Sequence, residues 1–245
     1  SSRLDSARGW LSFRSNETLR AYVVLPEEPG KSAILEILDV DLKSRKILLR
    51  SRIEGVEELL FLAADREGTR LLIHEAHSKR LSLYEAHSGR RLSILGEGPG
   101  SGRRASFLSD GRIVLAESLL DFSRRIRIFS EEGRELQTIS IEGRGPLNLG
   151  GEAAPGRLVV ATRPSPSARR TDSTVLLVDI SAASTRTLGQ NLYPVVASGW
   201  WVPGDPSLGS QLGSQATRLF LTQGGGLVSI DFATGARRAI LGRKD

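Results

Sequence analysis

The sequence predicts an all-β fold that is built from repeated, small antiparallel sheets. A two-part phrase recurs five times along the 245 residues. Apolar residues come in short, often β-branched runs that Gly, Pro, Asp and Ser interrupt, which is typical of strands and turns. Helical repeats of similar length would instead place apolar residues at i, i+3, i+4 and i+7. These observations favour strands over helices for the whole chain.

Each repeat opens with an arginine before a strand-like run and closes with an apolar residue, a polar residue and a tight turn. The opening arginines are Arg20, Arg70, Arg112, Arg157 and Arg218. The closing polar residues are Asp41, Glu85, Ser130, Asp179 and Asp231, which are 44, 45, 49 and 52 residues apart. A four-stranded antiparallel sheet with its turns needs about this length, and such sheets bury their faces by stacking. The repeat therefore predicts a β-propeller of five blades, with six blades as the alternative.

The predicted blades divide one domain that spans residues 1–245. Their approximate bounds are 9–50, 51–95, 96–140, 141–189 and 190–241. In the second blade we expect strands at 57–64, 70–75, 80–85 and 90–95. Gly89 lies in the last hairpin, where a tight turn requires a positive φ that glycine adopts readily.

Two segments resemble known propeller repeats. Residues 65–73 and 81–92 read DREGTRLLI and LSLYEAHSGRRL, and they resemble repeats of YVTN and WD-like bacterial propellers. Residues 96–102 and 109–115 read GEGPGSG and SDGRIVL, and they are similar to NHL-type and six-bladed propellers. The resemblance implies the fold and no catalytic residue, because many unrelated functions share these structural motifs.

Composition limits the chemistry and the partners. The chain has 34 basic and 28 acidic residues, a net charge of +6, but the two signs alternate and we expect no nucleic-acid partner. It has no cysteine, which excludes disulfides, thiolate metal sites and cysteine nucleophiles. The absence of methionine suggests a processed start, and together these features favour a periplasmic or secreted protein. No apolar run approaches the length of a membrane span.

The histidines are a weak candidate for a zinc site. His74, His77 and His87 lie close in sequence, and imidazole is a common zinc ligand. The expected strands place His77 and His87 at opposite ends of one blade, about 20 Å apart at ~3.3 Å per residue. We therefore predict no metal at these residues and no cofactor.

Aromatic and basic residues in loops form the candidate contact surface. Trp200 and Trp201, with Tyr193, are the clearest aromatic cluster, and adjacent strand residues point to opposite faces. One tryptophan would then be available to a protein or a sugar, although both could instead be packed. We expect loops 26–31, 164–172 and 200–203 to make contacts. They contain three further candidate binding residues, which are Lys31, Arg169 and Arg170.

Carboxylates and amides near the inner strands are the candidates for a calcium site. They are Glu57, Glu58, Asn148 and Glu152. Calcium prefers such oxygen ligands, but the adjacent glutamates should face opposite sides of a strand. The repeated arginines are a further candidate, because a ring of them could bind an anionic ligand. Their simpler interpretation is structural, with each arginine paired to a neighbouring acid.

These observations favour a non-catalytic protein-binding or scaffold module that presents loops on a rigid propeller. No set of catalytic residues emerges from the sequence. One alternative is a calcium-dependent lactonase or lyase, or a glycosidase-type propeller enzyme. The other is a carbohydrate-binding propeller that uses the tryptophans.

Overall fold

The computed structural model describes most of the chain as β-structure. The described residues are 8–13, 18–26, 32–56, 59–65, 67–75, 77–98, 102–165, 167–168, 172–194, 217–222, 227–231 and 236–241. Within them twenty strands form five four-stranded sheets, and all neighbouring strands are antiparallel. The described segments contain no α-helix, and hence none that could cross a membrane. The predicted all-β fold class is confirmed.

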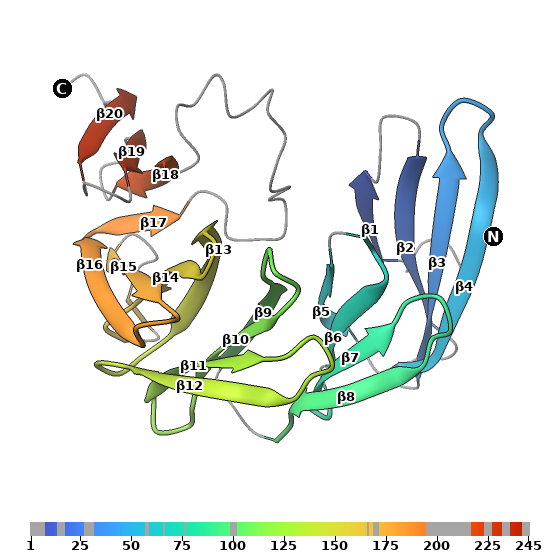
Figure 1. Cartoon of the computed structure of the whole chain (residues 1–245), viewed down its shortest axis with the longest axis horizontal. Helices are drawn as coiled ribbons and strands as arrows, with labels where there is room; N and C mark the ends of the chain where they lie inside the picture. The colour runs from blue at the N-terminus through green and yellow to red at the C-terminus, as the bar shows by residue number, and fades with distance from the viewer. Residues whose placement is uncertain are drawn as a thin grey trace. The chain divides into compact units, whose positions relative to one another are not determined.

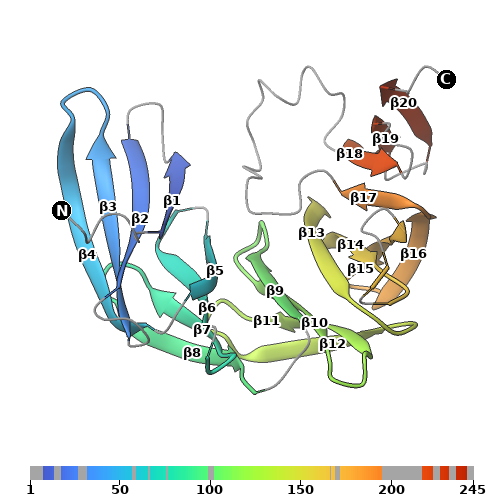
Figure 2. The same cartoon turned by 180° about the vertical axis from the view of Figure 1, so that it is seen from behind.

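Each sheet consists of four strands that are consecutive in the sequence, as Figures 1 and 2 show by colour. The first sheet contains β1 (Arg8–Phe13), β2 (Thr18–Pro26), β3 (Ala33–Asp41) and β4 (Lys46–Val56). The second contains β5 (Leu59–Ala64), β6 (Arg70–Glu75), β7 (Leu81–Glu85) and β8 (Arg91–Gly96). The third contains β9 (Gly102–Phe107), β10 (Ile113–Ser118), β11 (Arg124–Phe129) and β12 (Glu135–Ile141).

The last two sheets follow the same order. The fourth contains β13 (Leu147–Ala154), β14 (Arg157–Thr162), β15 (Thr174–Asp179) and β16 (Ser184–Gly189). The fifth contains β17 (Leu192–Pro194), β18 (Thr217–Thr222), β19 (Leu227–Asp231) and β20 (Arg237–Leu241). The chain divides into two compact units, one of Ser1–Gly98 with Glu132–Arg134 and one of Pro99–Glu131 with Glu135–Asp245. The single domain and the number of blades in a ring stay predictions.

The first unit has its core between the first and second sheets. Tyr22, Leu35 and Ile37 of the first sheet pack with Leu71 and Ile73 of the second. These residues alternate with others along their strands, because successive side chains of a strand point to opposite faces. The alternation of the sequence thus selects one face of each sheet for this core.

The second unit has two cores, one on each face of the fourth sheet. Leu158 and Val160 of β14 pack against the third sheet, at Val114 and Ile128 among others. Val159 lies on the opposite face and belongs to a cluster that includes Ile230 of the fifth sheet. The fourth sheet therefore lies between two neighbouring sheets, the arrangement that stacked repeats require.

The predicted turn chemistry is confirmed at Gly89. Its φ is +71°, and a Cβ at this position would lie 2.5 Å from the carbonyl oxygen of Arg52. The corresponding turn of the first sheet lacks glycine and places Arg45 at a φ of 57°. Both turns thus use the left-handed region, which is strained for arginine and not for glycine.

Candidate functional site

The repeated arginines are tied to acids in every blade where the structure describes their side chains. The paired residues are Arg20 with Asp39 at 2.6 Å, Arg70 with Asp65 at 3.0 Å, Arg112 with Asp110 at 2.7 Å, and Arg157 with Asp179 at 3.5 Å. The side chain of Arg218 lies outside the described residues. The observed pairs agree with the structural interpretation and give no support to a ring of available cations.

Arg20 joins the first sheet to the second. Its Nε and Nη2 each donate to one oxygen of Asp39 at 2.6 Å, and its Nη1 donates to the carbonyl oxygen of Gly68. The hydrogen bonds to Asp39 raise the pKa of Arg20 above its ordinary value, against the opposing effect of burial. Gly68 has a φ of +65°, and a Cβ there would meet the guanidinium at 2.4 Å. A larger residue here would be strained by the positive φ and would displace the guanidinium, so glycine is favoured.

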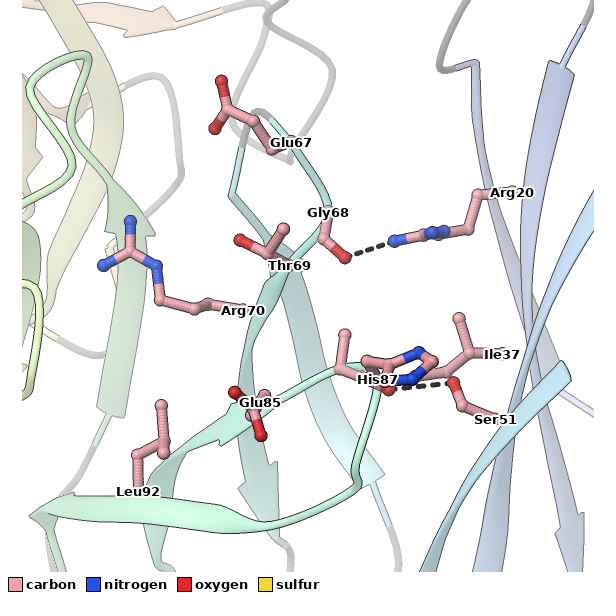
Figure 3. A pocket seen from close by; sticks show the side chains of 11 residues that line it. Arg20, Ile37, Ser51, Glu67, Gly68, Thr69, Arg70, Glu85, His87 and Leu92 are labelled. Carbon is pink, nitrogen blue, oxygen red and sulfur yellow. Dashed lines mark hydrogen bonds between the residues drawn. The ribbon is translucent and has the colours of Figure 1, made fainter. Parts of the chain in front are cut away.

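A pocket of about 490 Å³ lies within the first unit, beside this contact (Figure 3). Its lining residues are Arg20, Ile37, Ser51, Glu67, Gly68, Thr69, Arg70, Glu85, Ala86, His87 and Leu92. Hydrogen bonds hold its walls, since the amide of Ala86 donates to Thr69 at 2.8 Å and Ser51 Oγ donates to Ala86 at 2.8 Å. Both lining arginines are paired with the carboxylates of Asp39 and Asp65, and the lining acids Glu67 and Glu85 add further negative charge.

The third sheet carries a buried cluster of charges. The carboxylate of Glu117 on β10 is fully buried and accepts from Arg103 Nε at 2.9 Å and from Arg125 Nε at 2.7 Å. Arg127 Nη1 lies 3.7 Å from the same carboxylate. Glu117 is directly opposite Arg103 and Arg125 in the strand register. A carboxylate buried this deeply needs such partners, because an isolated buried charge is very costly.

A tight loop between β10 and β11 exposes two large apolar side chains. Leu120 is 63% exposed and Phe122 is 40% exposed. The amide of Leu119 donates to Ser123 at 2.9 Å and the amide of Phe122 donates to Leu119 at 3.0 Å, which closes the loop. Phe122 has a φ of 64°, a left-handed conformation that is a genuine outlier for a bulky residue. We call residues 119–123 the apolar tip.

Neighbouring loops hold the apolar tip in place. The amide of Gly145 donates to the carbonyl oxygen of Phe122 at 2.8 Å, and the amide of Leu147 donates to Ser118 Oγ at 2.8 Å. Gly145 has a φ of +115°, and a Cβ there would lie 2.4 Å from the carbonyl oxygen of Arg163. These contacts join the tip to the loop 142–146 and to the end of β14.

Arg124 lies beneath the apolar tip and binds four carbonyl groups. It donates to Gly145 at 3.0 Å, to Glu142 at 3.1 Å, to Arg163 at 2.6 Å and also to Arg144. The side chain is almost entirely buried, and burial lowers the pKa of Arg124. In the described part of the chain, no carboxylate is among its partners. Arg124 is therefore a brace that fixes the three loops to one another.

Most of the predicted contact residues and two of the calcium candidates lie outside the described residues. The contact residues are Trp200, Trp201, Arg169, Arg170 and Lys31, and the calcium candidates are Glu57 and Glu58. Tyr193 lies on β17, and its side chain is also outside the description. Pro164 of the predicted loop 164–172 is exposed and follows Arg163, which contacts Arg124.

The two described calcium candidates are not brought together. Asn148 and Glu152 both lie on β13, but a bulge between Leu149 and Gly151 changes the register between them. Asn148 pairs with Ala161 and Glu152 pairs with Leu158, so the two side chains face opposite sides of the sheet. Glu152 instead accepts from the amides of Ser109 at 2.6 Å and Gly156 at 2.8 Å.

The histidines are likewise separate. His74 is buried on β6, whereas His77 and His87 lie exposed in turns that follow β6 and β7. Among the residues that the structure describes, no three His, Cys, Asp or Glu side chains form a group that could hold a metal ion.

Sequence reasoning missed the apolar tip and the role of Arg124. Leu119 and Leu120 are a second apolar pair after the strand-like residues 113–116, so the sequence reads as more strand and conceals the turn. The pair Arg124 and Arg125 reads as a local patch of charge. A strand places the two side chains on opposite faces, where one binds carbonyl groups and the other binds Glu117. The position of Asp121 and Ser123 between two strands was the available signal, because such residues favour turns.

Comparison with known proteins identifies the fold. No protein-family model matches the chain, and no curated protein matches it. A chain from the crystal structure of a nidogen/laminin complex matches with a TM-score of 0.57 and 11% identity, over 96% of this chain and 80% of that chain. The β-propeller domain of the Trilobed protease from Pyrococcus furiosus, described as having an open velcro topology, matches with a TM-score of 0.59 and 10% identity. That match covers 97% of this chain and 72% of the propeller domain.

A third solved structure is an enzyme of greater length. Pyrococcus horikoshii acylaminoacyl peptidase matches with a TM-score of 0.59 and 10% identity, over 97% of this chain. The chain spans only 40% of the length of that peptidase. Together with the four-stranded sheets, these similarities show that the chain has a β-propeller fold. At these identities they show the fold alone, and the YVTN, WD-like and NHL repeat types stay predictions.

Proposed function

We propose that the protein is a non-catalytic protein-binding module whose docking surface includes the apolar tip. One observation carries the proposal, namely that Leu120 and Phe122 are exposed on a loop whose backbone is fixed. Exposed apolar residues that stand together on a surface are typical of interaction sites. The left-handed Phe122 strengthens the argument, because backbone strain concentrates at functional positions.

Rigidity favours this surface over an ordinary loop. Binding usually costs free energy because loops and side chains become ordered in the complex. Here the hydrogen bonds from Gly145 and Arg124 order the loops before a partner arrives. An aromatic side chain such as Phe122 on a pre-ordered support can act as an anchor, because aromatic residues contribute much of the energy of interfaces.

The proposal also agrees with two independent considerations. The predicted contact loop 164–172 begins beside the apolar tip, since Arg163 contacts Arg124. One structural neighbour comes from a nidogen/laminin complex, in keeping with a protein partner for a propeller of this kind. Contacts by Trp200, Trp201, Arg169, Arg170 and Lys31 remain part of the proposal.

The test compares two exposed leucines of the third sheet. Leu120 lies on the apolar tip, and Leu136 on β12 is 48% exposed and serves as the control. Proteins of the source organism that are captured by the wild-type chain are purified, and binding is then measured by calorimetry for Leu120→Ser, Phe122→Ser and Leu136→Ser. We expect the two tip variants to weaken binding at least about tenfold, as hot-spot residues do. Equal binding by all three variants would overturn the proposed surface.

A further inference from the structure

The strand ends around the apolar tip carry an excess of positive charge. Hydrogen bonds and strand pairing join the ends of the third and fourth sheets here, at residues 102–104, 117–125, 142–147, 163–165 and 172–173. These segments contain six arginines, which are Arg103, Arg104, Arg124, Arg125, Arg144 and Arg163. They contain four acids, which are Glu117, Asp121, Glu142 and Asp172. The local net charge is therefore +2, a third of the net charge of the chain.

The acids differ in how their charge is compensated. Glu117 is fully buried between Arg103 and Arg125. Asp121 is exposed, accepts from the amide of Ser123 at 3.0 Å and from Ser123 Oγ at 2.7 Å, and attracts the nearby Arg144. Glu142 is exposed and its backbone carbonyl binds Arg124, and Asp172 is half-buried. Glu117 is therefore compensated by two cations, and the excess of arginines over acids remains at this edge.

One of the cations, Arg124, is buried, and its partners among the described residues are carbonyl groups. Arg124 is 7% exposed and lies directly beneath the exposed loop 142–144. A buried charge is screened less by solvent than a surface charge, so its field reaches the surface above it. Arg144 is exposed on the same loop and adds a cation that a partner can reach. The surface around the apolar tip is therefore electropositive as well as apolar.

We infer that the apolar tip docks a protein segment that combines apolar side chains with carboxylates. This inference rests on the proposed function and adds the chemistry of the partner to it. The apolar residues of such a segment would cover Leu120 and Phe122, and its Asp or Glu residues would approach Arg144. Charge complementarity of this kind steers association and excludes partners of the wrong sign.

A nucleic acid fits this surface less well than a protein segment. It would bring one phosphate charge per nucleotide and need many cations, but Arg103, Arg124 and Arg125 are already bound to protein groups. Its bases would need stacking platforms, and Phe122 is the one aromatic side chain of the apolar tip. Leu120 would remain exposed in such a complex, whereas an apolar protein side chain would bury it.

The test uses a displayed library of random twelve-residue peptides as the probe. The library is panned on the full chain and counter-selected on Leu120→Asp, whose folding is checked by thermal unfolding. We expect the enriched peptides to contain apolar residues and more Asp and Glu than Lys and Arg. Their affinity is then measured by fluorescence anisotropy at low and high salt, for wild type, Arg144→Glu and the control Arg134→Glu. Arg134 is exposed in the turn between β11 and β12.

The outcomes distinguish a failure of this inference from a failure of the proposed function. We expect Arg144→Glu and high salt each to weaken binding at least about threefold, and Arg134→Glu to change it little, as for a specific surface charge pair. Peptides that depend on Leu120 but show no acidic excess and no effect of Arg144→Glu would overturn the inference and leave the proposed function standing. Failure to enrich any peptide that depends on Leu120 would count against both. Binding of an oligothymidine probe that Leu120→Asp abolishes would replace the protein partner by a nucleic acid.

Discussion

The first and fourth sheets have the same four-stranded order but differ in how they are buried. In β14 of the fourth sheet, every residue after Arg157 is buried, because one face packs on the third sheet and the other on the fifth. In β2, the corresponding second strand of the first sheet, Tyr22 is buried while Ala21 and Val23 are only half-buried. The repeat therefore determines that a four-stranded sheet forms. How much each strand contributes to stability depends on how many of its faces pack against neighbouring sheets.

The repeated arginine is more buried in the first sheet than in the fourth, which is the reverse of the burial of the strands. In the first sheet Arg20 and Asp39 are both buried and form two hydrogen bonds of 2.6 Å. In the fourth sheet the side chain of Arg157 is 50% exposed and lies 3.5 Å from Asp179. The same position of the repeat thus supports a buried ion pair in one sheet and a solvated pair in the other. Burial and geometry, which the motif does not encode, determine the energetic weight of the pair.

The largest expected difference comes from removing the acid of each pair. Asp39→Ala leaves Arg20 buried without its carboxylate, and we expect it to lower the free energy of unfolding by about 3–5 kcal/mol. Asp179→Ala removes a solvated partner of Arg157 and the turn hydrogen bonds from Ser181 and Ala182, and we expect a smaller loss of about 1 kcal/mol. Urea unfolding of both variants measures the contrast. Similar losses in the two sheets would show that the burial of Arg20 does not control its contribution.

Truncating apolar side chains tests the packing contrast directly. Leu158→Ala opens a cavity in the core between the third and fourth sheets and should destabilise the protein by about 2–5 kcal/mol. Leu38→Ala removes a half-buried side chain of the first sheet, and we expect about 1 kcal/mol. Both values come from thermal or urea unfolding. A larger loss for Leu38→Ala would contradict the assignment of a half-buried face to the first sheet.

Turn residues with left-handed backbones allow the cost of strain to be compared between the first and third sheets. The expected changes in stability are smaller than those above. Arg45 and Phe122 both have left-handed backbones, and glycine adopts this conformation without the steric cost. We expect Arg45→Gly and Phe122→Gly each to raise the free energy of unfolding by up to about 1 kcal/mol. Phe122→Gly should also weaken partner binding, whereas Arg45→Gly should leave it intact. If Phe122→Gly stabilised the protein and kept full partner binding, the strained backbone of Phe122 would have no role in binding.

The smallest expected effect concerns the turn aspartates of the first and fourth sheets. The backbone amide of Ser44 lowers the pKa of Asp41, and the hydroxyl of Ser181 lowers the pKa of Asp179. A lowered pKa means that each carboxylate stabilises the fold fully above its unfolded pKa of about 3.9 and loses this effect as the pH falls through the folded value. Carboxyl NMR titration should place both midpoints below the ordinary value. A midpoint at or above it would contradict these hydrogen bonds for that turn.

The sequence predicted the strands well where apolar runs and turns alternate clearly. The predicted strand 70–75 coincides with β6, and the predicted strand 80–85 begins one residue before β7. The site was less predictable, because it depends on three loops that are brought together by Arg124 from positions up to 39 residues away. Pattern reasoning assigns Arg124 to a charge pair, and only the fold reveals that its partners are backbone carbonyls. The left-handed conformation of Phe122 was equally hidden, since Asp121 and Ser123 indicate a turn but a bulky residue seldom adopts a positive φ.

Because every described sheet is made of consecutive strands, the topology allows the sheets to form in the order of synthesis. A sheet needs no strand from a distant part of the described chain, so each can form as soon as its fourth strand leaves the ribosome. Contacts that are local in sequence also form faster than distant ones. The nascent polypeptide would then mature one sheet at a time, and each completed sheet would offer an apolar face on which the next can fold.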